Sequence, residues 1–198
     1  MSNFAIQPCP PGSLPQVKLI TGRSFGDARG TFSEVFKLSA FRDGGMAFQP
    51  VQQNRSFSLP RFTLRGLHFQ RPPHAQAKLV RCLTGAIFDV AVDLRRGSPS
   101  YGTWVGARLE PGGDQLFVPK GYAHGFCTLL PETTVEYLVD AEYAAESDGG
   151  VAWDDPEIAV DWQAPHDQVV LSDKDGRQPM LAALGEIFVY EPQEEKPA

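Results

Sequence analysis

Apolar and polar residues alternate along most of the chain with a period of two, which is typical of β-strands rather than of helices. The clearest case is the run 87–94, in which Phe88, Val90, Val92 and Leu94 alternate with Ile87, Asp89, Ala91 and Asp93. This alternation predicts the two faces of one strand. Further strands are predicted at 17–19, 32–36, 48–56, 64–69, 79–83, 104–109, 115–118, 125–129 and 135–139.

Turn-forming residues separate these runs, notably at 44–45, 96–99, 110–113 and 119–121. Many short strands at such spacing predict an all-β sandwich or small barrel. Short helices are predicted only at 38–42 and 180–184.

The length of 198 residues favours one domain with a sizeable core. Residues 1–16 contain Pro8, Pro10, Pro11 and Pro15, so they are expected to form an extended arm rather than a helix. The domain proper is expected to span residues 17–190. Residues 191–198 are acidic, have little to bury, and are expected to form a flexible tail.

The composition of the chain argues against several classes of protein function. The formal net charge is −6 and the basic residues are scattered, so nucleic acid is not an expected partner. The three cysteines form no close pair, which favours reduced thiols in the cytoplasm over a disulfide framework. The sequence starts with no basic residues before an apolar run, and it contains no long apolar stretch, so neither secretion nor a membrane partner is predicted.

The residue types that support common cofactor and nucleophile chemistry do not have the required spacing. Gln70, rather than a second histidine, stands two residues after His68, so no metal site is predicted. The serines lack a Gly-x-Ser-x-Gly elbow, and no glycine-rich phosphate loop precedes a helix. We therefore expect no cofactor.

The remaining candidates are histidine, lysine, tyrosine and aspartate on or beside predicted strands, a set that suits proton transfer next to a carbonyl. A neutral histidine can remove a proton, a lysine can stabilise negative charge on oxygen, and a tyrosine can return a proton from the opposite face. A single histidine or tyrosine on a strand is more often a packed, hydrogen-bonded residue, so these residue types alone do not decide the function.

Ordered motifs decide between these readings of the polar residues. FGDARGTFSE, QQNRS, LRGLHFQ, QAKLVRCLTGAIFDVAVDLRRGSPSYGTW, VPKGYAHGF, EYLVDAEY, AWDDPEIAVDW and LSDKD occur in this order between about residues 17 and 184. In this the chain resembles the dTDP-4-dehydrorhamnose 3,5-epimerases. The resemblance implies an all-β jelly-roll barrel of the cupin type with a few short peripheral helices, no metal or cofactor, a homodimer, and a nucleotide-linked 4-keto-6-deoxyhexose as substrate.

The resemblance also implies roles for single residues. His68 is implied as the general base, Asp175 as the residue that orients it, Lys78 as the group that stabilises the enolate oxygen, and Tyr137 as the acid. Tyr143 is implied to stack on the thymine. The family holds nucleotide, diphosphate or sugar at the positions of Arg29, Glu34, Gln53, Asn54, Arg65, His124 and Lys174.

Two positions do not follow simply from the pattern. Strict alternation puts Arg65 on the strand face opposite His68, unless a bulge at Gly66 re-aims the chain. Without such a bulge, Arg65 must serve a different part of the ligand or the partner subunit. Asp148 stands where many relatives carry Glu, so its carboxylate is one methylene shorter.

The leading hypothesis is a double epimerase acting on carbons 3 and 5 of dTDP-4-dehydro-6-deoxy-D-glucose. Its close rival is a single-site epimerase on the same or a related sugar. A non-catalytic sugar-nucleotide-binding cupin and a metal-dependent dioxygenase are two hypotheses from different classes of protein. We also expect the N-terminal arm of each protomer to add to the sheet of its dimer partner.

Overall fold

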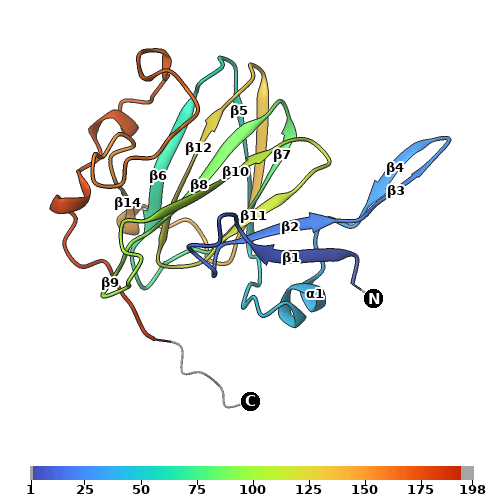
Figure 1. Cartoon of the computed structure of the whole chain (residues 1–198), viewed down its shortest axis with the longest axis horizontal. Coiled ribbons are helices and arrows are strands. Elements are labelled where there is room, and N and C mark those ends of the chain that lie inside the picture. The colour runs from blue at the N-terminus through green and yellow to red at the C-terminus, as the bar shows by residue number, and fades with distance from the viewer. Residues whose placement is uncertain (1, 193–198) are drawn as a thin grey trace.

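Two antiparallel β-sheets face each other in the computed structural model of this chain, which describes residues 2–192 (Figure 1). One sheet has six strands in the order β1-β2-β11-β7-β13-β5. These strands are β1 (Phe4–Pro8), β2 (Lys18–Gly22), β11 (Gln115–Val118), β7 (Lys78–Thr84), β13 (Thr133–Val139) and β5 (Gln52–Ser58).

The second sheet has five strands in the order β10-β8-β12-β6-β14. They are β10 (Trp104–Leu109), β8 (Ile87–Asp93), β12 (Tyr122–Thr128), β6 (Leu64–Gln70) and β14 (Asp148–Gly150). Neighbours in both sheets are often far apart in the chain, as in a jelly roll. The predicted all-β jelly-roll fold is thus confirmed.

A first core fills the space between the sheets. One sheet contributes Val80, Leu116 and Val135, and the other contributes Ile87, Ala91, Val105 and Phe126, all of them almost fully buried. Because side chains alternate along a strand, this core identifies the inner face of each sheet. Any polar residue an even number of positions away on the same regular strand therefore also faces inward.

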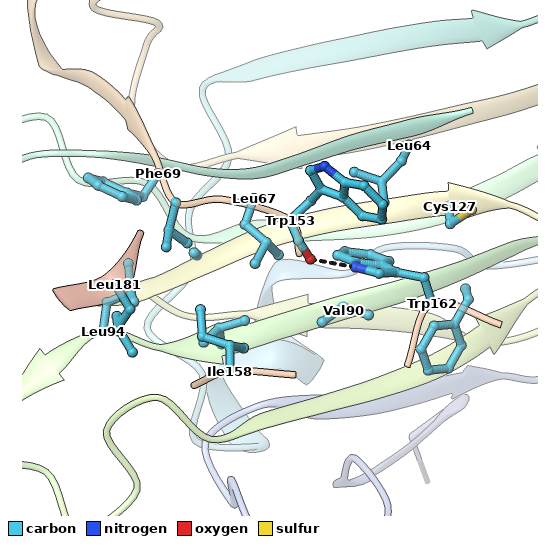
Figure 2. Packing of buried hydrophobic residues seen from close by; sticks show 14 of the residues in the cluster. Leu64, Leu67, Phe69, Val90, Leu94, Cys127, Trp153, Ile158, Trp162 and Leu181 are labelled. Carbon is cyan, nitrogen blue, oxygen red and sulfur yellow. Dashed lines mark hydrogen bonds between the residues drawn. The ribbon is translucent and has the colours of Figure 1, made fainter. Parts of the chain in front are cut away.

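A second core covers the outer face of the five-stranded sheet. The chain after β14 runs back over this face, where Trp153, Trp162 and Leu181 pack against Leu64, Leu67 and Val90 (Figure 2). The indole Nε1 of Trp162 donates a 2.8 Å hydrogen bond to the carbonyl of Trp153, which satisfies the polar atom of a buried aromatic side chain. We call residues 151–184 the C-terminal cover.

The N-terminal arm pairs with the chain's own sheet. Strand β1 lies antiparallel to β2, and β2 in turn pairs with β11. Phe4 packs against Phe41 in a third apolar cluster. Burial of Phe4 and Val17 anchors the arm on its own barrel, and β1 is an edge strand of that sheet. The addition of the arm to the sheet of a dimer partner stays a prediction.

The remaining elements are short. Strands β3 (Ser24–Asp27) and β4 (Gly30–Ser33) form a hairpin that projects from the body of the molecule (Figure 1). The other elements are α1 (Leu38–Asp43), β9 (Arg95–Arg96), β15 (Phe188–Val189), and the 3-10 turns at Ala145–Ser147, His166–Gln168, Asp175–Arg177 and Leu181–Ala183. The predicted helix at 38–42 is confirmed, whereas the one predicted at 180–184 is a single 3-10 turn. Of the predicted tail, residues 193–198 lie outside the described part.

The strands predicted at 17–19 and 125–129 are longer in the structure, and two further predicted strands have different bounds. The strand expected at 48–56 begins only at Gln52, because Pro50 lacks the N–H needed for a strand ladder. The strand expected at 32–36 ends at Ser33, where the chain leaves the hairpin.

Glu136 on β13 is an ion-pairing centre on the outer face of the six-stranded sheet. Its buried carboxylate accepts hydrogen bonds from Arg55, at 2.8 Å, and from Arg81. Burial alone would raise the pKa of Glu136, but these hydrogen bonds outweigh it and lower the pKa to about 2.

We expect Glu136→Gln to reduce the free energy of unfolding at pH 7 by on the order of 1–3 kcal/mol, because two arginines lose their shared anion. The contribution of the carboxylate is fully present above its unfolded-state pKa of about 4.5 and is lost as the pH falls toward 2. Urea unfolding at pH 7 and at pH 3 should therefore show a smaller difference between the two proteins at the lower pH. A difference that is the same at both values would contradict this interpretation.

Candidate active site

A bulge in β6 brings Arg65 and His68 to the same face of the strand. The register between β12 and β6 pairs His124 with His68 but Phe126 with Arg65, so β6 contains one extra residue. Leu64, Leu67 and Phe69 all belong to the outer core, at spacings of three and then two. The possibility that the sequence left open, a bulge at Gly66, is thus confirmed, and Arg65 faces inward with His68.

Glycine is required at the bulge for two reasons. Gly66 has a φ of +142°, outside the range that other residues adopt readily. A Cβ atom there would also lie 2.5 Å from the Cα atom of Gly125 in the neighbouring strand. The close approach of these two glycines sets the position of the histidine that follows.

His68 is paired with a carboxylate from the C-terminal cover. Its Nε2 lies 2.5 Å from Oδ1 of Asp175, and the hydroxyl of Ser172 donates to Oδ2 of Asp175 at 2.9 Å. Burial would raise the pKa of Asp175, but the hydrogen bonds from His68 and Ser172 lower it overall. Asp175 is therefore ionised at neutral pH and holds the proton of His68 on Nε2, which leaves Nδ1 as the basic nitrogen.

A second histidine–carboxylate pair lies behind the first. His124 is directly opposite His68 in the strand register, and its Nε2 lies 2.7 Å from Oδ1 of the fully buried Asp89 on β8. Burial lowers the pKa of His124, so this imidazole is neutral at pH 7. Sequence reasoning did not select Asp89, although a carboxylate within a strand that is otherwise buried and mostly apolar was the available signal.

The six-stranded sheet contributes a cation and a phenol. Lys78 lies two residues before the inward-facing Val80, and Tyr137 is paired with Val80 in the strand register. Both side chains therefore face the other sheet. Burial lowers the pKa of Lys78 to about 8, while the charges of Asp89 and Asp148 act in the opposite direction. Burial raises the pKa of Tyr137, so this phenol is protonated at neutral pH.

Asn54 joins this inner set, since it is paired with Tyr137 across β5 and β13. Its Oδ1 accepts a 2.8 Å hydrogen bond from Gln52, and Gln52 accepts one from the backbone N–H of Tyr143 at 2.9 Å. The ring of Tyr143 is itself 60% exposed. Such an aromatic side chain, uncovered and tied to the edge of the site, has a face free for stacking.

Asp148 and Lys174 form an ion pair beside Asp175. The ammonium of Lys174 contacts Oδ2 of Asp148, which joins β14 to the loop that carries Asp175. The shorter side chain at position 148 therefore still reaches a cation of the site.

Three predicted residues do not join the inner set. Arg29 lies on the projecting hairpin and pairs with Asp27 at 2.5 Å. Glu34 follows the same hairpin and accepts a hydrogen bond from Asn3 at 3.3 Å. Gln53 is next to Asn54 on a regular strand, so it faces outward, on the same side of the sheet as Glu136. The hairpin projects away from β6, the strand that carries His68 (Figure 1).

Within residues 2–192, the structure holds no group of three or more His, Cys, Asp or Glu side chains arranged to bind a metal ion. In the same residues no helix is long and apolar enough to cross a membrane.

Comparisons with known proteins agree with this geometry. The family model described as dTDP-4-dehydrorhamnose 3,5-epimerase matches residues 11–183. A protein of that name from Sinorhizobium fredii is 52% identical over 179 residues, which cover 90% of this chain and 91% of the relative.

Solved structures show the same fold. A dTDP-6-deoxy-D-glucose-3,5-epimerase from Legionella pneumophila, in complex with dTDP-4-keto-L-rhamnose, superposes with a TM-score of 0.89 at 36% identity, over 96% of this chain and 100% of the other. A 3'-monoepimerase from Streptomyces bikiniensis, in complex with dTDP-quinovose, superposes with a TM-score of 0.82 at 32% identity, over 90% and 91% of the two chains. With a family model that spans most of its length and a relative that shares half its residues, the chain belongs to the dTDP-4-dehydrorhamnose 3,5-epimerase family.

Proposed function

We propose that the chain inverts carbons 3 and 5 of dTDP-4-dehydro-6-deoxy-D-glucose and so forms dTDP-4-dehydro-L-rhamnose. The observation that carries this proposal is the opposition of a base and an acid. His68, held by Asp175, lies on the inner face of one sheet, and Tyr137 lies on the inner face of the other. An epimerase needs this arrangement, because the proton must leave one face of the carbon and return to the other.

The reaction requires no redox step. The 4-keto group acidifies the protons on carbons 3 and 5, and Nδ1 of His68 takes one of them to form an enolate. Lys78 stabilises the negative charge that develops on the keto oxygen, a contribution that typically amounts to about 10² to 10³ in rate. Tyr137 then protonates the carbon from the opposite face. His68 releases its proton to solvent and Tyr137 takes one up from solvent, after which the same steps at the second carbon complete the double inversion.

The substrate-binding roles follow from position. We assign Arg65, Asn54 and His124, which face inward, to the sugar and diphosphate, and Tyr143 to the thymine ring. The ion pair of Asp148 and Lys174 borders the base and can exchange its internal contact for contacts with sugar or phosphate oxygens.

A single-site epimerase remains the second candidate, and the similarity to a 3'-monoepimerase favours it specifically. The decisive experiment incubates the protein with dTDP-4-dehydro-6-deoxy-D-glucose in deuterated water and locates the label by NMR. We expect deuterium at both carbons. Label at one carbon only would support the single-site candidate, and label at neither would exclude epimerisation of this sugar.

We also propose that the protein acts as a homodimer in the cytoplasm. The three cysteines are buried free thiols, which is consistent with a reducing compartment. Arg29, Glu34 and Gln53 match ligand-holding positions of the family, yet they lie on the hairpin or the outer sheet face of their own chain. In a dimer that packs through these surfaces, they would contact the substrate of the partner.

Dimers that combine two different variant chains test whether both protomers contribute to one substrate site. Light scattering at micromolar concentration should give twice the chain mass of 21.7 kDa. Arg29→Ala and His68→Ala should each be impaired alone, and their mixture should recover up to about a quarter of the normal rate, because half of the dimers have one intact site.

A mixture of His68→Ala with Tyr137→Phe is the matched control. These two residues belong to the same chain's site, so no intact site can form in that mixture. A monomer in solution, a fully active Arg29→Ala protein, or equal recovery in both mixtures would contradict the shared site.

A further inference from the structure

Asp89 is the most deeply buried ionisable group near the reacting residues. It lies on the inner face of β8, between Ile87 and Ala91 of the first core, with no exposed surface. One carboxylate oxygen accepts the hydrogen bond from His124, but Oδ2 has no hydrogen-bond partner among the described residues. A buried carboxylate with one unpaired oxygen is costly, so the fold must gain something by keeping it there.

The groups around Asp89 indicate what the fold gains by burying this carboxylate. Lys78 faces it from the opposite sheet, and the two interact electrostatically without a direct ion pair. Among residues 2–192, the ionisable groups that interact with this pair are His124 on β12, His68 on β6 through His124, and Asp148 and Lys174 at the edge of the site. The thiols of Cys9 and Cys82 in the core also feel the charge of Asp89, which raises their pKa values. Because Asp148 and Lys174 pair with each other, Asp89 is the least compensated anion near Lys78.

We propose that Asp89 is a positioning residue: its negative charge keeps Lys78 protonated, and its bond to His124 leaves Nδ1 of that ring free to accept a hydrogen bond from the substrate. The functional consequence rests on the proposed enolate chemistry, because only a cationic lysine stabilises an enolate oxygen fully. The unpaired Oδ2 fits this role, since an anion without a second hydrogen bond exerts its field undiminished on the nearest cation. Burial raises the pKa of Asp89, whereas His124 and the charge of Lys78 lower it, so the ionised carboxylate depends on these two partners.

The electrostatic coupling can be measured without any assay of activity. The sequence contains six lysines, so the ammonium of Lys78 can be followed by NMR in protein labelled with ¹³C and ¹⁵N at lysine. In the unaltered protein, Lys78 should titrate near pH 8. In Asp89→Asn, which removes the charge and keeps the shape, the midpoint should fall by about one pH unit or more.

Asp93→Asn is the matched control. Asp93 is equally buried on the same strand, but it is neutralised by Arg95 and by the hydroxyls of Ser98 and Ser100. Its replacement should leave the titration of Lys78 unchanged. If both variants shift Lys78 equally, the effect is structural and the proposal is overturned.

A reciprocal measurement covers the case in which Asp89→Asn does not fold. Coupling between two sites is symmetric, so Lys78→Met must raise the titration midpoint of Asp89 by the same amount. The side-chain ¹³C signal of Asp89 reports this directly. An Asp89 signal that is protonated at pH 7 in the unaltered protein, or that does not move in Lys78→Met, overturns the proposal.

The activity profile separates this proposal from the proposed function. In Asp89→Asn, the alkaline limb of the rate profile should move to lower pH by the same shift that NMR records for Lys78. If NMR shows the shift but the protein does not exchange deuterium into the keto sugar, the coupling stands and the proposed function fails. If exchange proceeds but neither midpoint moves, the proposed function stands and the role of Asp89 fails.

Discussion

His68→Ala is expected to abolish the incorporation of solvent deuterium into the keto sugar, while the affinity for dTDP stays nearly unchanged. Among residues 2–192, His68 is the only inward-facing residue whose basic nitrogen is free and whose tautomer is fixed by a carboxylate of the C-terminal cover. Loss of a general base typically lowers a rate by about 10² to 10⁴. NMR of the sugar in deuterated water measures the exchange, and calorimetry measures dTDP binding.

Two further variants are compared with His68→Ala. Asp175→Asn should slow exchange less severely, since the base remains but its tautomer and orientation are no longer held. His166→Ala is the matched control, because this histidine lies exposed on the C-terminal cover. Near-normal exchange in His68→Ala would mean that another residue is the base.

Tyr137→Phe is expected to separate exchange from inversion. The ring and its packing remain, but the phenolic proton is lost, so the acid cannot act from its side of the carbon. His68 still forms the enolate and can return a deuteron to the face from which the proton came. Label should therefore enter substrate of unchanged configuration, while inversion falls by about 10² or more.

The two rates are compared in one experiment, with NMR reporting both the label and the configuration of each carbon. Tyr101→Phe provides the matched control, because that phenol packs against the outer core rather than facing the site. If exchange and inversion decrease together in Tyr137→Phe, Tyr137 positions the sugar and does not protonate it.

The central strands could be predicted from the sequence because their two faces meet different environments. Strands β6, β7, β8, β10, β11 and β13 lie close to the predicted ranges. Strands β1, β3, β9, β14 and β15 were missed. They are edge or hairpin strands with little burial, so alternation in the sequence does not mark them.

The residues of the site also divide into those that the sequence could place and those that it could not. His68, Lys78 and Tyr137 could be assigned to strands from their local pattern, but the pattern alone could not align them across the barrel. The resemblance supplied Asp175, which is 107 residues from His68 in the chain and is joined to it only by the folded cover. Asp89 was read as one polar member of an alternating strand, because its meaning depends on His124 and Lys78 from two other strands.

Strict alternation along the strand places Arg65 on the face opposite His68, whereas the bulge in the structure brings both side chains to the same face. The one-residue insertion in β6 depends on the contact between Gly66 and Gly125, which lie on different strands. A pattern that is read along one strand cannot contain that information. The same holds for Gln53 and Asn54, which the resemblance grouped together and the pleat separates.

The C-terminal cover has a consequence for the order in which the protein is made. Every strand of the two facing sheets has left the ribosome once residue 150 and the stretch that fills the exit tunnel are synthesised, yet the carboxylate that orients the base emerges later. Until the cover docks, the outer face of the five-stranded sheet also lacks Trp153, Trp162 and Leu181. Such a nascent chain has its barrel strands but exposes apolar surface, which makes it a target for chaperones. Full catalytic competence is then the last property the chain acquires during synthesis, because a chain that ends before Asp175 lacks the carboxylate that orients the base.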